Sequence, residues 1–102
     1  MDVVFTAPQL IDDLDLLSTP VNYVSYRVRS LDKKEHDVQF YLETTPEIAI
    51  NDNTQPTTAT VFSQKGIRYV KAGSIEQPVC AKKGDGLCID WGYVYLAAPS
   101  AA

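Results

Sequence analysis

Basic residues are scarce in this sequence. Lys and Arg together number 9 against 13 Asp and Glu, which gives a formal net charge of −4 and a pI of about 4.7. A general nucleic-acid binder needs a basic face to neutralise phosphates, and an anionic membrane surface selects for the same charge. The composition therefore argues against both nucleic acid and an anionic membrane as partners.

The sequence also lacks long apolar runs, and it contains a single histidine. No stretch is long enough to cross a bilayer, and Met1 and Asp2 lead into apolar residues without a basic leader region. We therefore predict no membrane insertion and no targeting segment in this chain. The single histidine, His36, lies among charged residues, which favours an ordinary exposed side chain over the base of a nucleophile–His–carboxylate arrangement.

Only two cysteines are present, Cys80 and Cys88, on either side of a Lys-Gly-Asp-Gly turn signal at residues 83–86. Across a short hairpin loop they could face each other within disulfide reach. The alternative is a pair of buried free thiols, which is common for cysteine. With one histidine and no second cysteine pair, the sequence offers no typical metal-ligand set. We predict no metal and no cofactor.

What the sequence does contain is alternation at the period of a β-strand. Apolar residues alternate with polar ones over residues 21–30 and again over 36–44, on either side of a polar turn. Two such runs predict an antiparallel hairpin with one solvated face. The leucine spacing over residues 10–17 allows at most a short helical turn.

Further strand signals complete an all-β pattern. They cover residues 3–7, 58–64, 67–71, 79–82 and 87–96, and the last run is apolar on both faces, which predicts a central strand. About seven short strands without a long helix predict an antiparallel β-sandwich, with residues 1–102 as a single domain. We expect its core to contain Val24, Tyr26, Val28, Val38, Phe40, Leu42, Ile89 and Trp91.

The run Asp90-Trp91-Gly92-Tyr93, with Tyr95 beyond it, is the candidate interface or ligand platform. Aromatic rings beside a carboxylate could stack on a sugar. The alternative is that Trp91 and Tyr93 fill the core while Gly92 permits a close backbone approach. Asp90 would then need a partner, because an unpaired buried carboxylate is costly.

Three segments resemble the glutaminase A-type family of secreted and periplasmic proteins. They are residues 11–21 (IDDLDLLSTPV), 23–41 (YVSYRVRSLDKKEHDVQFY) and 84–96 (GDGLCIDWGYVYL), in the family's order and at plausible spacing. Cys88 departs from the arginine that is usual in the family.

The resemblance implies a β-sandwich accessory region that packs on an all-helical catalytic domain of the same protein, in the periplasm or outside the cell. The implied reaction of that parent protein is hydrolysis of L-glutamine to L-glutamate and ammonia, and no family catalytic residue maps onto this chain. We therefore expect a non-catalytic fragment of a larger protein, capable of self-association; the alternative is a complete small protein. Two other classes compete: a carbohydrate-binding module of a glycosidase-like protein, and an adhesion-type interaction domain.

Overall fold

The computed structural model describes residues 1–101, which form two compact units that divide between Tyr41 and Leu42. Each unit contains one antiparallel sheet, and the only helices among the described residues are two short ones. The predicted all-β, antiparallel class is confirmed. Five strands form over these residues where about seven were expected, and the sandwich arrangement stays a prediction.

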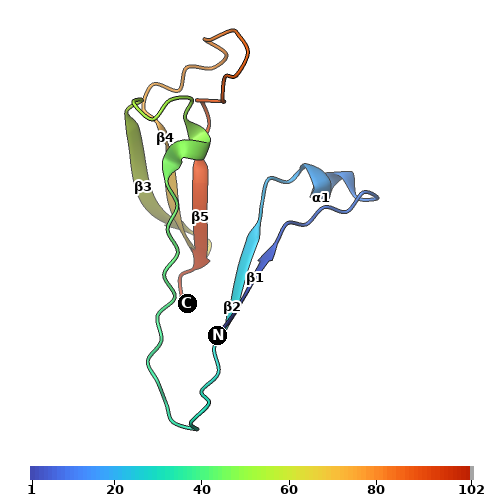
Figure 1. Cartoon of the computed structure of the whole chain (residues 1–102), viewed down its shortest axis with the longest axis vertical. Helices are drawn as coiled ribbons and strands as arrows, with labels where there is room; N and C mark the ends of the chain where they lie inside the picture. Colours follow the sequence, from blue (N-terminus) through green and yellow to red (C-terminus); the bar gives the residue numbers. More distant parts are fainter. Residues whose placement is uncertain (102) are drawn as a thin grey trace. The chain divides into compact units, whose positions relative to one another are not determined.

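The first unit is a two-stranded ribbon with a short helix between its strands (Figure 1). Strand β1 (Asp2–Thr6) pairs with β2 (Tyr23–Arg27), so that Val3 lies opposite Tyr26 and Phe5 opposite Val24. This places the side chains of Val3, Phe5, Val24 and Tyr26 on one face, while those of Val4 and Tyr23 lie on the other. Helix α1 (Leu14–Ser18) is the short helical turn that the leucine spacing predicted.

The predicted hairpin between residues 21–30 and 36–44 is wrong. β2 pairs with β1 instead, and residues 28–45 form no strand. The alternation in the second run nevertheless produces one contact, because the Phe40 ring stacks on Tyr26 with centroids 4.4 Å apart. The alternation over residues 36–44 thus corresponds to a side chain, Phe40, that packs against β2, and not to a strand that pairs with β2.

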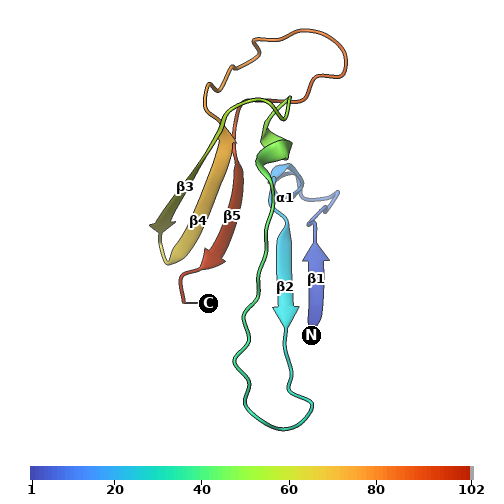
Figure 2. The ribbon, with the colours of Figure 1, turned by 60° about the vertical axis from the view of Figure 1, so that its left-hand side comes forward.

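The second unit is a three-stranded sheet of order β3-β4-β5 (Figure 2). Strands β3 (Thr57–Gln64) and β4 (Ile67–Ser74) confirm the predicted strands at 58–64 and 67–71. Lys65 and Gly66 connect them with φ of 50° and 77°. Two central residues with positive φ make the type I′ turn that matches the twist of a hairpin. Strand β5 (Val94–Pro99) is the third strand.

The predicted hairpin around residues 83–86 is also wrong. No strand forms over 79–82, and the expected central strand at 87–96 begins only at Val94 and lies at the edge of the sheet. Gly92, with φ of 89°, departs from extended geometry just before β5. Residues 75–93 instead form the long loop that follows β4, seen above the sheet in Figure 1.

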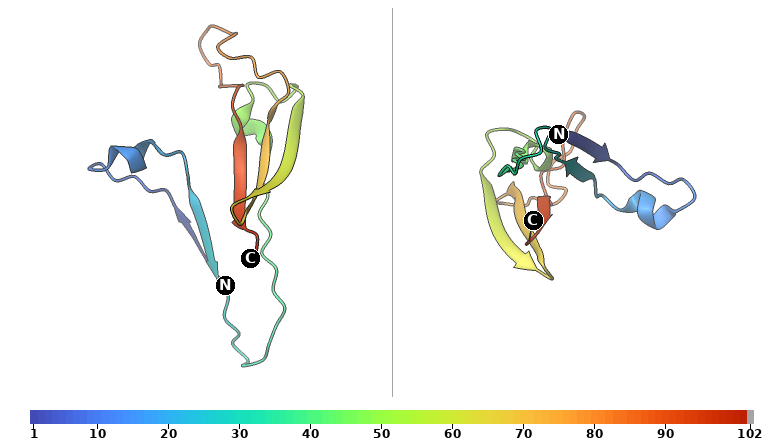
Figure 3. Two further views of the ribbon diagram at one scale, coloured as in Figure 1. Left: turned by 180° about the vertical axis from the view of Figure 1, so that it is seen from behind. Right: turned by 90° about the horizontal axis from the view of Figure 1, so that it is seen from below.

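The centre of burial differs from the predicted core. Among residues 1–101, the buried hydrophobic residues are Ala49 and Ile50, at the end of the 3-10 helix η1 (Pro46–Ala49). This helix contacts β4 and β5, and the reverse view in Figure 3 shows it against the same sheet. Val24 and Phe40 are half-buried, whereas six predicted core residues are exposed: Tyr26, Val28, Val38, Leu42, Ile89 and Trp91. The predicted hairpins would have covered these side chains, and they do not form.

Candidate functional site

The four predicted platform residues divide into one buried carboxylate and three exposed rings. Asp90 is only 5% exposed, whereas Trp91, Tyr93 and Tyr95 are 37%, 39% and 50% exposed. Tyr95 lies on β5, and the other three precede that strand. The two alternatives therefore apply to different residues: Asp90 is internal and partnered, and the rings face outward.

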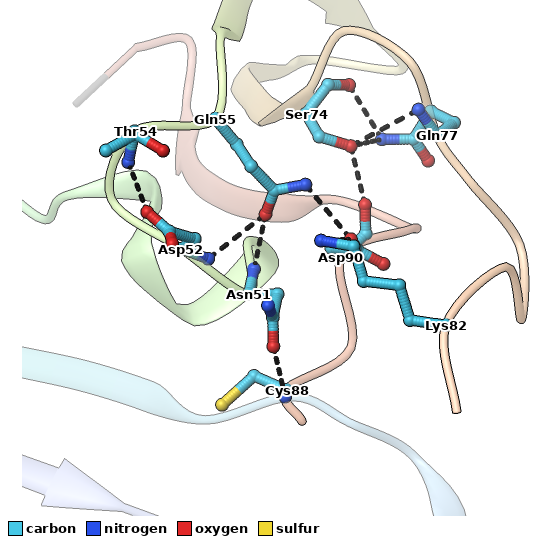
Figure 4. Close-up of polar contacts among 9 residues, drawn as sticks. All are labelled: Asn51, Asp52, Thr54, Gln55, Ser74, Gln77, Lys82, Cys88 and Asp90. Carbon is cyan, nitrogen blue, oxygen red and sulfur yellow. Dashed lines mark hydrogen bonds and ion pairs between the residues drawn. The ribbon is translucent and has the colours of Figure 1, made fainter. Parts of the chain in front are cut away.

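A polar cluster surrounds Asp90, and we call it the Asp90 cluster (Figure 4). Asp90 Oδ2 accepts a hydrogen bond of 3.0 Å from Gln55 Nε2 and lies 3.5 Å from Lys82 Nζ. Gln55 Oε1 in turn accepts from the backbone N–H groups of Asn51 and Asp52, at 2.7 and 3.1 Å. The carboxylate thus joins the turn before β3 to the loop before β5, and a buried charge of this kind needs such partners.

Gln77 joins the two ends of the same loop, and its Nε2 also donates to the carbonyl of Ser74, the last residue of β4, at 2.9 Å. Its Nε2 donates to the carbonyl of Gly92 at 3.1 Å, and its Oε1 accepts from the Gly92 N–H at 2.6 Å. The buried hydroxyl of Ser74 donates to the backbone carbonyl of Asp90 at 2.6 Å. These bonds satisfy backbone groups that no strand partner would otherwise reach.

Gly73 leaves the space that this arrangement needs. A Cβ atom at residue 73 would lie 2.7 Å from the Gly92 carbonyl oxygen and 2.8 Å from Cδ1 of Tyr93. Real side chains do not tolerate contacts this short, so β4 must carry glycine where the loop crosses it. The close backbone approach predicted for Gly92 is thus provided by Gly73.

One face of the three-stranded sheet carries aromatic rings, and we call it the aromatic face. Phe62 on β3 and Tyr69 on β4 are direct partners and stack with centroids 5.0 Å apart. Lys71, two residues along β4, is paired with Tyr95 in the ladder and places its Nζ 3.6 Å from the centroid of the Tyr93 ring. This is cation–π geometry, and it holds Tyr93 beside the sheet.

The opposite face of the sheet is a shallow groove next to η1. Its lining is small and largely apolar: Thr44, Pro46, Thr57, Thr58, Ala59, Val70, Ala72, Val94 and Leu96. The groove contains no ionisable side chain, which makes it unsuited to acid–base chemistry.

The two cysteines do not face each other across a hairpin, because that hairpin is not formed. Cys80 and Cys88 are both free thiols, and both are exposed, so the alternative of two buried thiols is wrong as well. The backbone N–H of Cys88 donates to Asn51 Oδ1 at 2.8 Å, which adds a further link to the Asp90 cluster. Cys80 has a φ of 51°, which is uncommon for a residue with a side chain.

His36 lies in an exposed turn of the first unit. Its Nε2 is 2.8 Å from Asp32 Oδ1, which also accepts from the Ser30 hydroxyl and the Lys34 N–H. The hydrogen bond from His36, followed by that from Ser30, lowers the pKa of Asp32 from its ordinary value of 3.8. Over the described residues, no group of three or more His, Cys, Asp or Glu side chains is gathered as a metal site.

Asp13, one of three aspartates at residues 12–15, has a structural role. Asp13 Oδ1 accepts from the Leu16 N–H at 3.0 Å and so caps the N-terminus of α1. Carboxylates are favoured at this position because the first N–H groups of a helix have no partner within it.

A protein-family model described as "Domain of unknown function (DUF5127)" matches residues 1–102. The chain belongs to the DUF5127 family. The match extends over both compact units, so the family model treats them as one stretch of sequence. No curated protein and no solved structure matches the chain. Within residues 1–101 of this DUF5127 chain, no helix is both long and apolar enough to cross a membrane.

Sequence reasoning about this DUF5127 chain missed the amide side chains of Gln55 and Gln77. Gln55 bonds Asp90, 35 residues away on another segment of the second unit, and Gln77 bonds Gly92, 15 residues away at the other end of the same loop. Glutamine has no preferred spacing to such partners, so no pattern in the sequence marks either residue. One signal was present in the sequence. If Trp91 and Tyr93 filled the core, Asp90 would be buried, and a buried carboxylate requires a hydrogen-bond partner that the sequence did not identify.

Proposed function

We propose that this domain is a non-catalytic accessory domain of a secreted or periplasmic glutaminase, and that it packs on the catalytic domain of that protein. The reaction of the parent is hydrolysis of the side-chain amide of L-glutamine by water, which yields L-glutamate and ammonia. The chemistry belongs to the catalytic domain, and the role of the present chain is to support and shape it. The three resembling segments at residues 11–21, 23–41 and 84–96 support this assignment.

The observation that carries the packing role is the open aromatic face. Phe62, Tyr93 and Tyr95 present exposed rings on one side of a three-stranded sheet, and no other element of the second unit covers them. Aromatic residues are enriched at protein interfaces because they bury much area at little entropic cost. Packing of the catalytic domain on this face would bury the aromatic rings that the second unit itself leaves exposed.

The attachment of residues 75–93 supports the same role. The third resembling segment contains Asp90 and Gly92. Asp90 is bonded to Gln55 and, through its carbonyl, to Ser74 at the end of β4, and Gly92 is bonded to Gln77. That segment leads into β5 and so fixes Tyr93 and Tyr95 on the aromatic face. Ordering mobile side chains on binding costs free energy and lowers affinity. Exposed rings that are already held in place avoid that cost and therefore suit a docking surface.

The packing role can be tested in the parent protein. Tyr95→Glu places a charge on the aromatic face, and we expect it to lower the temperature at which ammonia release from L-glutamine is lost. Ile75→Glu is the matched control, since Ile75 is also exposed but lies in the loop after β4. Equal inactivation temperatures for Tyr95→Glu and the unmodified parent would contradict packing through this face.

A carbohydrate-binding module is the second candidate, and the outward exposure of Trp91 and Tyr93 favours it. The position of Lys71 over the Tyr93 ring counts against it, because the ammonium group occupies a ring face that a sugar would use. Trp91 is the only tryptophan, so its fluorescence reports directly on this site. A saturable emission change on titration with cello- or xylo-oligosaccharides would support the sugar platform, and no change would exclude these sugars as ligands.

A further inference from the structure

The outer edge of the three-stranded sheet is formed by β3, which carries none of the usual protections of an edge strand. Its eight residues, TTATVFSQ, are all exposed and include no charged residue and no proline. Edge strands in monomeric proteins are commonly blocked by charge, proline or a bulge, because their free N–H and C=O groups are a template for another strand. β3 is therefore prepared for pairing.

The ladder with β4 decides which β3 groups point outward. Ile75 N–H donates to the carbonyl of Pro56 at 3.0 Å, in continuation of the β3–β4 register. Directly opposed antiparallel residues alternate between hydrogen-bonded and non-bonded pairs, so the even-numbered residues of β3 bond to β4. The N–H and C=O groups of the odd-numbered residues face away from the sheet: Thr57, Ala59, Val61 and Ser63. Over residues 1–101 these outward groups have no backbone partner.

The other edge of the sheet offers fewer groups. Ser100 N–H donates to the carbonyl of Gly66 at 2.8 Å, so the even-numbered residues of β5 bond to β4 and the odd-numbered ones face outward. One of those outward residues is Pro99, which has no N–H, and β5 is two residues shorter than β3. Proline at an outward position is one of the protections that β3 lacks.

We propose that β3 pairs with β3 of a second copy of this chain, antiparallel about a two-fold axis that passes through Thr60. In this register Thr57 lies opposite Ser63 of the second copy, and Ala59 lies opposite Val61. Both members of each pair are outward-facing residues, so all four outward N–H groups and all four carbonyls on each strand obtain partners. The two sheets become one continuous six-stranded antiparallel sheet.

The side chains of β3 suit this register. On one face Ala59 meets Val61, which pairs a small with a larger apolar side chain, and on the other Thr60 meets Thr60 across the axis. No charged residue occurs on β3, so no like charges are brought together at the contact. A two-fold interface uses the same patch on both subunits and must be self-complementary, which this strand is. The proposal goes beyond the accessory role and does not depend on the glutaminase assignment.

The test is sedimentation equilibrium of the chain over a dilution series, with one proline variant on each edge strand. We expect a concentration-dependent mass that approaches twice 11.3 kDa. Ala59→Pro removes an outward N–H of β3 and no bond to β4, so it should reduce the mass to that of a monomer. Ala97→Pro makes the same change on β5 and should leave the dimer intact. A dimer that survives Ala59→Pro, or a wild-type chain that is monomeric at every concentration, would overturn the proposal.

Amide hydrogen exchange of the unmodified chain gives a second test that does not depend on a variant folding. In the dimer, the outward amides of Ala59 and Val61 should exchange as slowly as the inward amides of Thr60 and Phe62. Their exchange should speed up on dilution, whereas that of the inward amides should not. Fast exchange of Ala59 and Val61 at all concentrations would contradict pairing through β3. These amides could instead be protected only in the longer parent protein, while that protein stays monomeric. Such a result would mean that β3 pairs with another strand of the same protein, and it would also overturn the proposal.

Discussion

The side-chain amide of Gln77 makes two hydrogen bonds with the backbone of Gly92, one to its carbonyl and one from its N–H. Nε2 donates to the Gly92 carbonyl and Oε1 accepts the Gly92 N–H, so the glutamine takes the place of a neighbouring strand. The bond matters because Gly92, with φ of 89°, interrupts the extended chain just before β5. Gln77 thus joins the two ends of residues 75–93, and Ser74 at the end of β4 bonds both Gln77 and the carbonyl of Asp90.

Gln77→Ala should lower the free energy of unfolding by about 1–3 kcal/mol, because it leaves the N–H and C=O of a half-buried Gly92 without partners. The measurement is urea unfolding followed by the fluorescence of Trp91, the residue next to Gly92. Gln64→Ala is the control: Gln64 is exposed at the end of β3, and its side chain makes no hydrogen bond over the described residues. Equal effects of the two substitutions would show that the Gln77–Gly92 pair contributes nothing.

Asp90 and Lys82 should contribute unequally although they form one ion pair. Asp90→Ala removes a buried acceptor and strands the Gln55 amide, which should cost about 1–3 kcal/mol. Lys82→Met should cost no more than about 1 kcal/mol, because the lysine side chain is 49% exposed and water already solvates its ammonium group. Comparable losses in urea unfolding would indicate that the ion pair, rather than the Gln55 hydrogen bond, holds Asp90.

Gly73→Ala should disturb the loop that crosses β4. The added Cβ would meet the Gly92 carbonyl and the Tyr93 ring below normal contact distance, and relief of such overpacking typically costs about 1–3 kcal/mol. We expect large amide chemical-shift changes at Gly92 and Tyr93 in the NMR spectrum. Ala72→Ser, one residue earlier and on the opposite face, should leave those two signals in place. Unchanged shifts in Gly73→Ala would contradict the close approach.

The His36–Asp32 hydrogen bond makes a prediction about pH. The pKa of Asp32 is lowered in the folded chain, first by His36 and then by Ser30, so its contribution to stability is present above pH 3.8 and is lost as the pH falls through the folded pKa. An NMR titration should give a midpoint below 3.8 for Asp32, and His36→Ala should raise it toward 3.8. Asp52 is the internal control, because its pKa is lowered by hydrogen bonds from Thr54 and should not respond to His36→Ala. An unmoved Asp32 midpoint would contradict the assignment of His36 as the main cause.

Local signals predicted the strands whose partners are close in sequence. Residues 58–64 and 67–71 were predicted as strands, and they form the β3–β4 hairpin because the Lys65-Gly66 turn brings them together. β1 and β2 were each predicted as strands, but their pairing was not, because residues 36–44 offered an equally good alternation nearby. Periodicity identifies which face of a segment is apolar, and it does not identify the neighbour that covers that face.

The candidate site was predicted only in part, because the sequence does not show which segments contact it. Asp90, Trp91, Tyr93 and Tyr95 were singled out by residue type, and the structure divides them into a buried carboxylate and outward rings. The strand predicted over 87–96 fails in its first half, because the loop backbone is bonded by the side chains of Gln77, Ser74 and Asn51 rather than by a strand. Such long-range side-chain bonds leave no periodic mark in the sequence.

The most direct test of the accessory role is an ammonia-release assay with L-glutamine, performed on the purified chain alone and on the parent protein that contains it. The proposal predicts ammonia and L-glutamate from the parent in equal amounts and no turnover by the isolated chain. Turnover by the isolated chain would contradict the assignment of the chemistry to another domain. Inactivity of a folded parent toward L-glutamine would contradict the glutaminase assignment itself.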